Sequence, residues 1–140
     1  MKKILLTLVL TLTIILPVFA AANWVPVGNN IYMDTYSVKK YNYMGYNYGN
    51  YYSIWIKRSN DCSEIFLDSN NTCRKDISHN LTHFIMDCNN DKYAVKGFTN
   101  YDYRGHTIDN YELSDYQITW SSNIPDSVGS YWYNYACNSR

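Results

Sequence analysis

The hydrophobic and polar positions of this chain alternate over short segments, and this alternation predicts β-strands. Aromatic and β-branched residues are concentrated in these segments, as they are in strands of known structure. Turn-forming residues separate them, so we expect sequential hairpins and an antiparallel sheet. The expected strands cover residues 24–27, 31–34, 51–58, 79–87, 92–103 and a stretch within 109–120.

The expected strand before Cys88 has two distinct faces, because side chains alternate along a strand. Phe84, Met86 and Cys88 fall on one face, and Ile85 falls on the other. The residues Asn89–Asp91 tolerate left-handed backbone, so they predict a hairpin turn into the next strand. The face that carries Phe84 and Met86 is suited to the docking of an amphipathic helix.

The last segment, residues 124–137, can be interpreted in two ways. Its run of aromatic residues favours a strand by propensity. However, Asp126 or Ser127 could cap a helix. Four side chains also repeat at helical spacing: Val128, Tyr131, Trp132 and Tyr135. We favour a helix with these four residues on one face, and a strand is the alternative.

The N-terminus has the pattern of a secretory signal peptide. Two lysines precede an apolar run, Ile4–Leu16, and small residues follow it. The run is shorter than the roughly 20 residues that span a bilayer, so we expect cleavage after Ala20 or Ala22. The chain would then consist of a signal peptide, residues 1–22, and a single domain, residues 23–140.

The charge balance argues against a nucleic-acid partner. The chain has 12 Lys and Arg against 12 Asp and Glu, and loss of the two signal lysines leaves 10 against 12, a formal charge of −2. Phosphate binding needs clustered cations, which this balance does not supply. No later segment is apolar enough to span a bilayer, so no transmembrane segment is expected after cleavage. Exposed aromatic strand edges would permit a dimer without predicting one.

All four cysteines lie in the predicted domain: Cys62, Cys73, Cys88 and Cys137. An even number of cysteines in an exported chain indicates two disulfides, for which three pairings can be drawn. A zinc site is the competing interpretation, but the chain has no Cys-x-x-Cys pair. A bridge between Cys62 and Cys73 would close a loop of about a dozen residues and contribute roughly 3 kcal/mol.

Residues 41–52 are rich in tyrosine, with Asn and Gly between the tyrosines. The simplest interpretation is a β-hairpin that turns at Gly45 or Gly49, with cross-strand tyrosine pairs fixing the register. Tyr, Asn and Gly also dominate antibody binding loops, so one face of this ribbon could contact a ligand. Trp55 and Trp120 are expected in the core instead. Five tyrosines are the candidate binding residues: Tyr41, Tyr43, Tyr46, Tyr48 and Tyr51.

The sequence contains no pattern typical of an enzyme or of a cofactor site. No nucleophile elbow, phosphate loop or HExxH motif is present. His79 and His83 have the spacing of a helical metal pair, but on a strand they would lie roughly 13 Å apart. We therefore interpret them as exposed strand residues. Two segments, starting at Asn70 and Asn80, match the glycosylation acceptor pattern, and we interpret both as exposed loops.

Short motifs follow one another along the predicted domain: Trp24-Val25, Tyr32–Asp34, Ile54–Lys57, Asp87-Cys88, Ile124-Pro125 and Tyr135–Cys137. In their order and spacing they resemble the surface-adhesin protein E family, small exported domains of Gram-negative-type bacteria. The resemblance covers essentially all of residues 23–140. It implies an α+β fold, in which an antiparallel sheet of about six strands carries a C-terminal helix on its concave face. It also implies a Cys88–Cys137 disulfide between helix and sheet, contributing roughly 4 kcal/mol.

The same resemblance implies a function. The best-known member of the family acts as an adhesin, so this chain is expected to be a non-enzymatic binding domain that is secreted, displayed on the cell surface or periplasmic. Its expected partners are extracellular proteins or glycans, host matrix proteins included, contacted through the tyrosine-rich ribbon. The alternative is a periplasmic or envelope accessory protein with a structural role and a bacterial partner.

Overall fold

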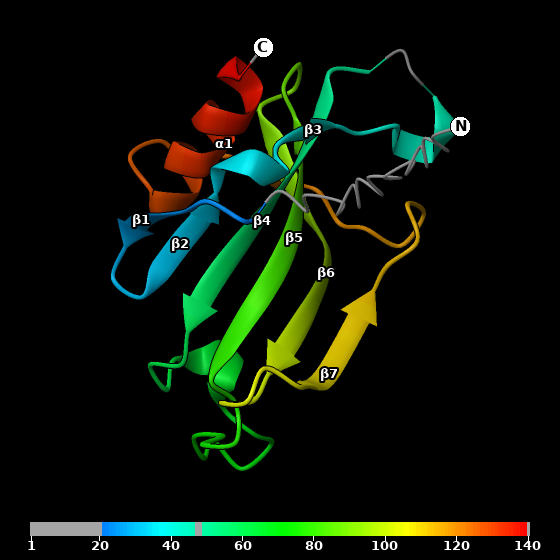
Figure 1. Cartoon of the computed structure of the whole chain (residues 1–140). Helices are drawn as coiled ribbons and strands as arrows, with labels where there is room; N and C mark the ends of the chain where they lie inside the picture. The colour runs from blue at the N-terminus through cyan, green and yellow to red at the C-terminus, as the bar shows by residue number, and fades with distance from the viewer. Residues whose placement is uncertain (1–20, 47–48, 140) are drawn as a thin grey trace, which may run out of the picture.

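The protein is described by a computed structural model that covers residues 21–46 and 49–139. The predicted signal peptide, residues 1–22, therefore lies almost wholly outside the described residues, and its cleavage stays a prediction. The described chain forms one antiparallel sheet with a helix against one of its faces (Figure 1). Within these residues, no helix is both long and apolar enough to cross a membrane.

The sheet has eight strands, six of which follow the order β1-β2-β4-β5-β6-β7. Their bounds are β1 (Trp24–Gly28), β2 (Ile31–Asp34), β3 (Lys39–Lys40), β4 (Tyr51–Ser59), β5 (His79–Asp87), β6 (Lys92–Tyr101), β7 (Thr107–Glu112) and β8 (Ser121–Ser122). Every pairing is antiparallel, with β3 beside β4 and β8 beside β6. The six strands expected from the sequence are confirmed as this path, and β3 and β8 are short additions.

The last long strand, β7, begins and ends earlier than the predicted range, 109–120. The cause is the turn that precedes it. The Asp102 carboxylate accepts hydrogen bonds from the backbone N–H groups of Arg104 and His106, both at 2.8 Å, and so closes a tight turn that lets pairing resume at once. After β7 the segment 113–120 leaves the sheet and contributes Ile118 to the core on the far side.

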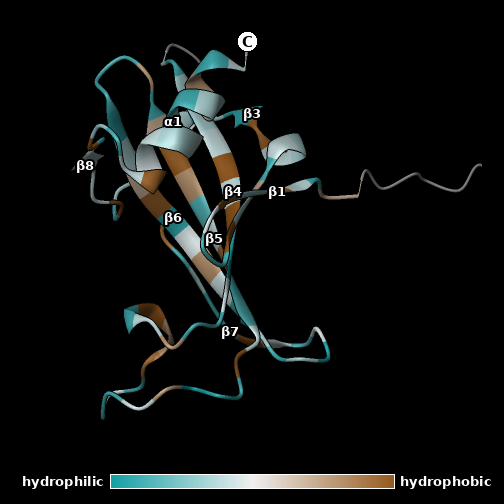
Figure 2. Ribbon diagram, turned by 90° about the vertical axis from the view of Figure 1, so that its left-hand side faces the viewer, coloured by the Kyte–Doolittle hydropathy of each residue, from teal (hydrophilic) through white to brown (hydrophobic). Residues whose placement is uncertain are grey.

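The helix α1 (Val128–Asn138) packs on what we call the helix face of the sheet (Figure 2). As predicted, Phe84, Met86 and Cys88 lie on this face, where they contact the buried side of α1. The Cys88–Cys137 disulfide is confirmed, with a Cα–Cα distance of 5.6 Å. Ile85 points to the opposite face and joins a second core there.

The predicted helix is confirmed, and the four residues at helical spacing divide between core and solvent. Ser127 caps the helix by accepting a hydrogen bond from the Ser130 N–H at 3.0 Å. Trp132 is buried and Tyr135 packs against the core, whereas Val128 is 39% exposed and Tyr131 is 55% exposed. The side chains that the helix buries are Trp132, Tyr133, Ala136 and Cys137. The bond to Cys88 explains the difference, because it turns the last helical turn toward the sheet.

The segment between β4 and β5, residues 60–78, buries two of its apolar side chains. The predicted Cys62–Cys73 disulfide is confirmed, and it closes this segment. Phe66, at the end of η3 (Glu64–Phe66), is fully buried, and Ile77 is 1% exposed. The disulfide and these buried side chains therefore hold in place a segment whose polar sequence predicts no regular structure.

Candidate functional site

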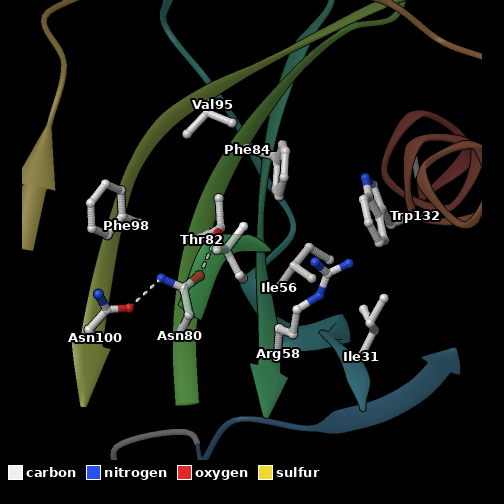
Figure 3. Close-up of a pocket in the computed structure, with 11 residues that line it drawn as sticks. Ile31, Ile56, Arg58, Asn80, Thr82, Phe84, Val95, Phe98, Asn100 and Trp132 are labelled. Atoms are coloured by element: carbon white, nitrogen blue, oxygen red, sulfur yellow. Dashed lines mark hydrogen bonds between the residues drawn. The ribbon is translucent and has the colours of Figure 1, made fainter. Parts of the chain in front are cut away.

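A groove of about 460 Å³ opens on the helix face, between α1 and the segment 60–78. Side chains on the helix face of β2, β4, β5 and β6 form its floor. Trp132 of α1 and Ile65 of η3 form its sides. Figure 3 shows the floor residues pointing into the same space. From β5 and β6 these are Asn80, Thr82, Phe84, Val95, Phe98 and Asn100.

A β-bulge in β6 brings its three groove residues onto one face. Phe84 of β5 pairs with Val95, but His83 pairs with Gly97, so Lys96 is an extra residue in the ladder. Because side chains alternate along a strand, an extra residue shifts the alternation by one. Phe98 therefore joins Val95 on the groove floor. The sequence pattern alone would have placed Phe98 on the opposite face from Val95.

A row of side-chain amides fixes one end of the groove. The Thr82 hydroxyl donates to Asn80 Oδ1 at 2.6 Å, and the Asn80 side-chain amide donates to Asn100 Oδ1 at 2.8 Å (Figure 3). Asn100 in turn donates to Asp109 Oδ2 at 3.4 Å, and Arg74 holds the same oxygen at 2.6 Å. Asn80 and Asn100 are 7% and 6% exposed. The prediction that Asn80 lies in an exposed loop is therefore wrong.

Arg58 brings a positive charge to the groove. It lies near the end of β4 and is half-buried, and its guanidinium points past Ile56 toward Trp132 in Figure 3. Within the described part of the chain it forms no ion pair with a carboxylate. The Asp61 carboxylate interacts electrostatically with Arg58, but its hydrogen bond is with the Ser63 N–H. A cation therefore faces an otherwise apolar wall.

The tyrosine-rich segment does not form the tight hairpin that the sequence predicts. Tyr43–Gly45 is a 3-10 turn, η2, in which Met44 has a positive φ of 52°. At the base of the segment the Tyr41 N–H donates to the Tyr51 carbonyl oxygen at 2.9 Å. We call residues 41–51 the tyrosine loop. It projects from the sheet on the side away from α1 (Figure 1).

One carboxylate, that of Asp115, holds the tyrosine loop in place. Its oxygens accept hydrogen bonds from the Tyr41 hydroxyl at 2.6 Å, the Lys96 ammonium at 2.8 Å and the Met44 N–H at 2.7 Å. Burial raises the pKa of Asp115, but the bonds from Lys96 and Tyr41 outweigh it and leave the pKa below its ordinary value. Lys96 itself is 8% exposed. The carboxylate is therefore ionised, and it anchors Tyr41 and Met44 of the loop.

The candidate binding tyrosines have different surroundings. Tyr43 and Tyr51 pack on each other and on Trp120, with ring centroids 5.0 to 5.9 Å apart. Tyr41 packs against the core of the opposite face. Tyr46 is 64% exposed. Tyr48 lies outside the described residues.

The two histidines of β5 are half-buried, so the expectation that they are exposed is wrong. His83 stacks on Trp55 with ring centroids 4.5 Å apart, and His79 stacks on Tyr101 at 5.0 Å. Burial lowers the pKa of both rings; the charge of Lys57 adds to this effect at His79, and Glu112 partly opposes it at His83. No group of three or more metal-ligating side chains occurs among residues 21–46 and 49–139.

The fold belongs to the class of antiparallel sheets that carry a C-terminal helix on one face. No family model and no curated protein matches the sequence. Solved structures of Haemophilus influenzae protein E do match the fold. Crystal form II has a TM-score of 0.52 and 14% identity, covering 79% of this chain and 81% of that one. The structure from non-typeable H. influenzae has a TM-score of 0.52 and 15% identity, covering 86% and 76%.

A selenomethionine form of H. influenzae protein E gives the same result, with a TM-score of 0.52, 14% identity, and coverage of 77% of this chain and 78% of that one. At these identities the likeness concerns the fold. The fold that the sequence resemblance implied is therefore confirmed, with the helix and the sheet in the expected arrangement. The two disulfides fit a protein that is exported to an oxidising compartment.

Proposed function

We propose that this protein is an exported, non-enzymatic binding domain, adhesin-like in function, that contacts an extracellular protein or glycan through its tyrosine loop. The fold likeness to protein E supports a binding role. The two disulfides support export, because disulfides persist in oxidising compartments. Residues 23–140 act as one domain in this proposal.

The observation that carries the proposal is the anchoring of the tyrosine loop by Asp115. Two hydrogen bonds, from the Tyr41 hydroxyl and the Met44 N–H, join the loop to a carboxylate that also pairs with Lys96 of β6. A loop held in one shape loses less conformational entropy when it binds. Tyrosine adds a large contact area for few rotatable bonds, which is why binding loops are rich in it.

The structure suggests separate roles for the five candidate tyrosines. Tyr41, Tyr43 and Tyr51 support the loop, because their rings or hydroxyls are engaged with the core and Asp115. Tyr46 is the proposed contact residue because it is 64% exposed at the loop. Tyr48 is a proposed contact from its position in the sequence alone.

The test compares Tyr46→Ser with Tyr103→Ser. Tyr103 is 75% exposed in the β6–β7 turn, at the far end of the sheet (Figure 1), so the control makes the same chemical change away from the loop. We expect the oxidised, exported protein to bind at least one matrix protein or glycan in a panel measured by surface plasmon resonance. Tyr46→Ser should weaken that binding about tenfold, the size typical of an interface aromatic, and Tyr103→Ser should leave it unchanged.

Two results would contradict the proposal. Equal binding by both variants and the wild type would place the contact surface elsewhere on the domain. Failure of the folded, oxidised wild type to bind any component of the panel would favour the alternative, an envelope accessory protein with a bacterial partner. Circular dichroism of each variant establishes that the fold is unchanged.

A further inference from the structure

We propose that the groove on the helix face is a binding site for a small amphipathic monocarboxylate, with Arg58 receiving the carboxylate and the groove floor holding the apolar body. This site is separate from the tyrosine loop. Tyr41, Tyr43 and Tyr51 of the tyrosine loop pack on the opposite face of the sheet, and none of the loop residues that the structure describes lines the groove. The two proposals can therefore be tested independently.

The size and the lining of the groove suit a small apolar body. Its volume of about 460 Å³ lies within the range of about 300–1,000 Å³ that ligand pockets occupy. Phe84 and Phe98 are half-buried on the floor, while Val95 is 38% exposed and Ile65 is 50% exposed. These apolar side chains remain partly in contact with water, so a ligand that covers them gains hydrophobic free energy.

The charge of the groove selects an anion. Arg58 is the cation on its wall, and it forms no ion pair with a carboxylate within residues 21–46 and 49–139. A guanidinium offers a planar pair of donors that matches a carboxylate, and the match is strongest where water is partly excluded. The nearby acidic group beyond Asn100, Asp109, is already paired with Arg74 at 2.6 Å. It therefore does not compete for Arg58.

The amide row sets the orientation of the ligand. Asn80 and Asn100 are bonded to each other, to Thr82 and to Asp109, so they form a rigid row of amides. Arg58 lies directly opposite Asn80 on β4 and continues this row on the side away from Asn100. A carboxylate at the Arg58 side of the row meets the cation, whereas at the Asn100 side it would lie near Asp109. The anion is therefore placed beside Arg58, with the apolar body running over Phe84 and Phe98 (Figure 3).

Binding to the full oxidised protein can be measured by NMR titration with decanoate, an acyl carboxylate, and 2-naphthoate, an aromatic one. Decan-1-ol provides a ligand of matched length without the charge. We expect one or both carboxylates to shift the backbone signals of Phe84, Val95 and Phe98 in a saturable way. Binding of decanoate alone would identify an acyl body, and binding of naphthoate alone would identify an aromatic body.

The matched variants are Arg58→Gln and Arg104→Gln. Arg104 is exposed in the β6–β7 turn, so its replacement makes the same change in net charge away from the groove. We expect Arg58→Gln to weaken carboxylate binding about tenfold or more and to leave decan-1-ol binding unchanged. Arg104→Gln should change neither. Ile65→Asp, which places a charge at an exposed position on the side of the groove, should weaken the binding of all three ligands.

The proposal is overturned if neither carboxylate shifts the groove signals, or if Arg58→Gln and Arg104→Gln weaken binding equally. Tyr46→Ser keeps the groove intact, so its carboxylate affinity should equal that of the wild type. A failure of carboxylate binding in a protein that still binds matrix components would refute this site alone.

Discussion

At the scale of single residues, the Asp115 side chain has a large influence on how the tyrosine loop is held against the sheet. Its carboxylate joins Lys96 of β6 to the tyrosine loop, so one group supports the sheet and the loop together. Both charges are well buried, with side-chain exposures of 10% for Lys96 and 16% for Asp115. A buried ion pair adds little over an apolar pair, but removal of one partner leaves an unpaired buried charge.

We therefore expect Asp115→Asn to lower the free energy of unfolding by about 3 kcal/mol. Lys96 would then be buried without its counterion. Urea unfolding of the oxidised protein measures the change. Lys96→Met combined with Asp115→Asn should regain a large part of the loss, because the unpaired charge is gone. If the double variant is as unstable as the single one, the hydrogen bonds to the tyrosine loop are the larger contribution.

The pH dependence has a defined sign. The folded-state pKa of Asp115 is depressed, so its stabilisation is fully present above the unfolded-state pKa, about 4. The contribution is lost as pH falls through the folded-state pKa, because the carboxyl gains a proton and the ion pair ends. The difference in stability between wild type and Asp115→Asn should accordingly shrink under acid conditions, and a difference that stays constant would contradict this account.

At the scale of elements, the bulge in β6 decides which residues form the groove. Gly97 stands at the bulge, where an added Cβ would lie 2.5 Å from the Tyr111 carbonyl oxygen of β7. Such a contact requires one of the two strands to move. Glycine therefore allows β7 to approach β6 at the position where the strand alternation shifts.

We expect Gly97→Ala to destabilise the protein by about 1–3 kcal/mol, the range seen for overpacking. Gly129→Ala is the matched control: in α1 the nearest atom to an added Cβ lies 3.5 Å away. Alanine is favoured over glycine in a helix, so this control should be neutral or more stable by about 0.5 kcal/mol. Thermal unfolding compares the two. Equal melting temperatures for both variants would show that β7 shifts freely.

The elements also show how far sequence reasoning reaches. The alternating strands, the Asn89–Asp91 turn and the Ser127 cap depend on local preferences, so they could be predicted. The groove could not be predicted from the sequence. Asn80 resembled part of a loop, and the bulge before Gly97 moves the Phe98 side chain to the other face of the sheet. A glycine inside a strand is a known signal of a bulge, and it was the one clue available.

The tyrosine loop and the buried face of the helix escaped prediction for a different reason, since long-range contacts determine both. Composition indicated tyrosine pairs across a hairpin. Asp115, more than sixty residues further along the chain, pulls Met44 into a turn instead. In α1 the spacing of apolar residues identified a helix, but the disulfide to Cys88 selects which side of it faces the sheet. Local patterns cannot contain either of these facts.

At the scale of the whole molecule, a disulfide stabilises each side of the groove, one by joining α1 to the sheet and one by closing the segment 60–78 on itself. Cys88–Cys137 holds α1, which carries Trp132, and Cys62–Cys73 closes the segment that carries Ile65. Their sequence separations are 49 and 11 residues. The chain-entropy model assigns roughly 4 kcal/mol to the first and roughly 3 kcal/mol to the second.

The two disulfides should therefore differ in what their loss does. Replacing Cys88 and Cys137 with serine should lower the free energy of unfolding by about 4 kcal/mol and loosen α1 from the sheet. Replacing Cys62 and Cys73 should lower it by about 3 kcal/mol and leave the contacts of α1 intact. Hydrogen exchange of α1 amides separates the outcomes, and equal protection of α1 in both double variants would contradict this assignment.

The position of the two bonds has a consequence for where the protein can act. Inside a reducing cytosol both cysteine pairs would be thiols, so α1 would have no covalent link to the end of β5 and the loop that carries Ile65 would not be closed. In an oxidising compartment, formation of the two bonds would fix both sides of the groove in the same step that stabilises the fold. The groove would therefore be held most firmly where disulfides persist.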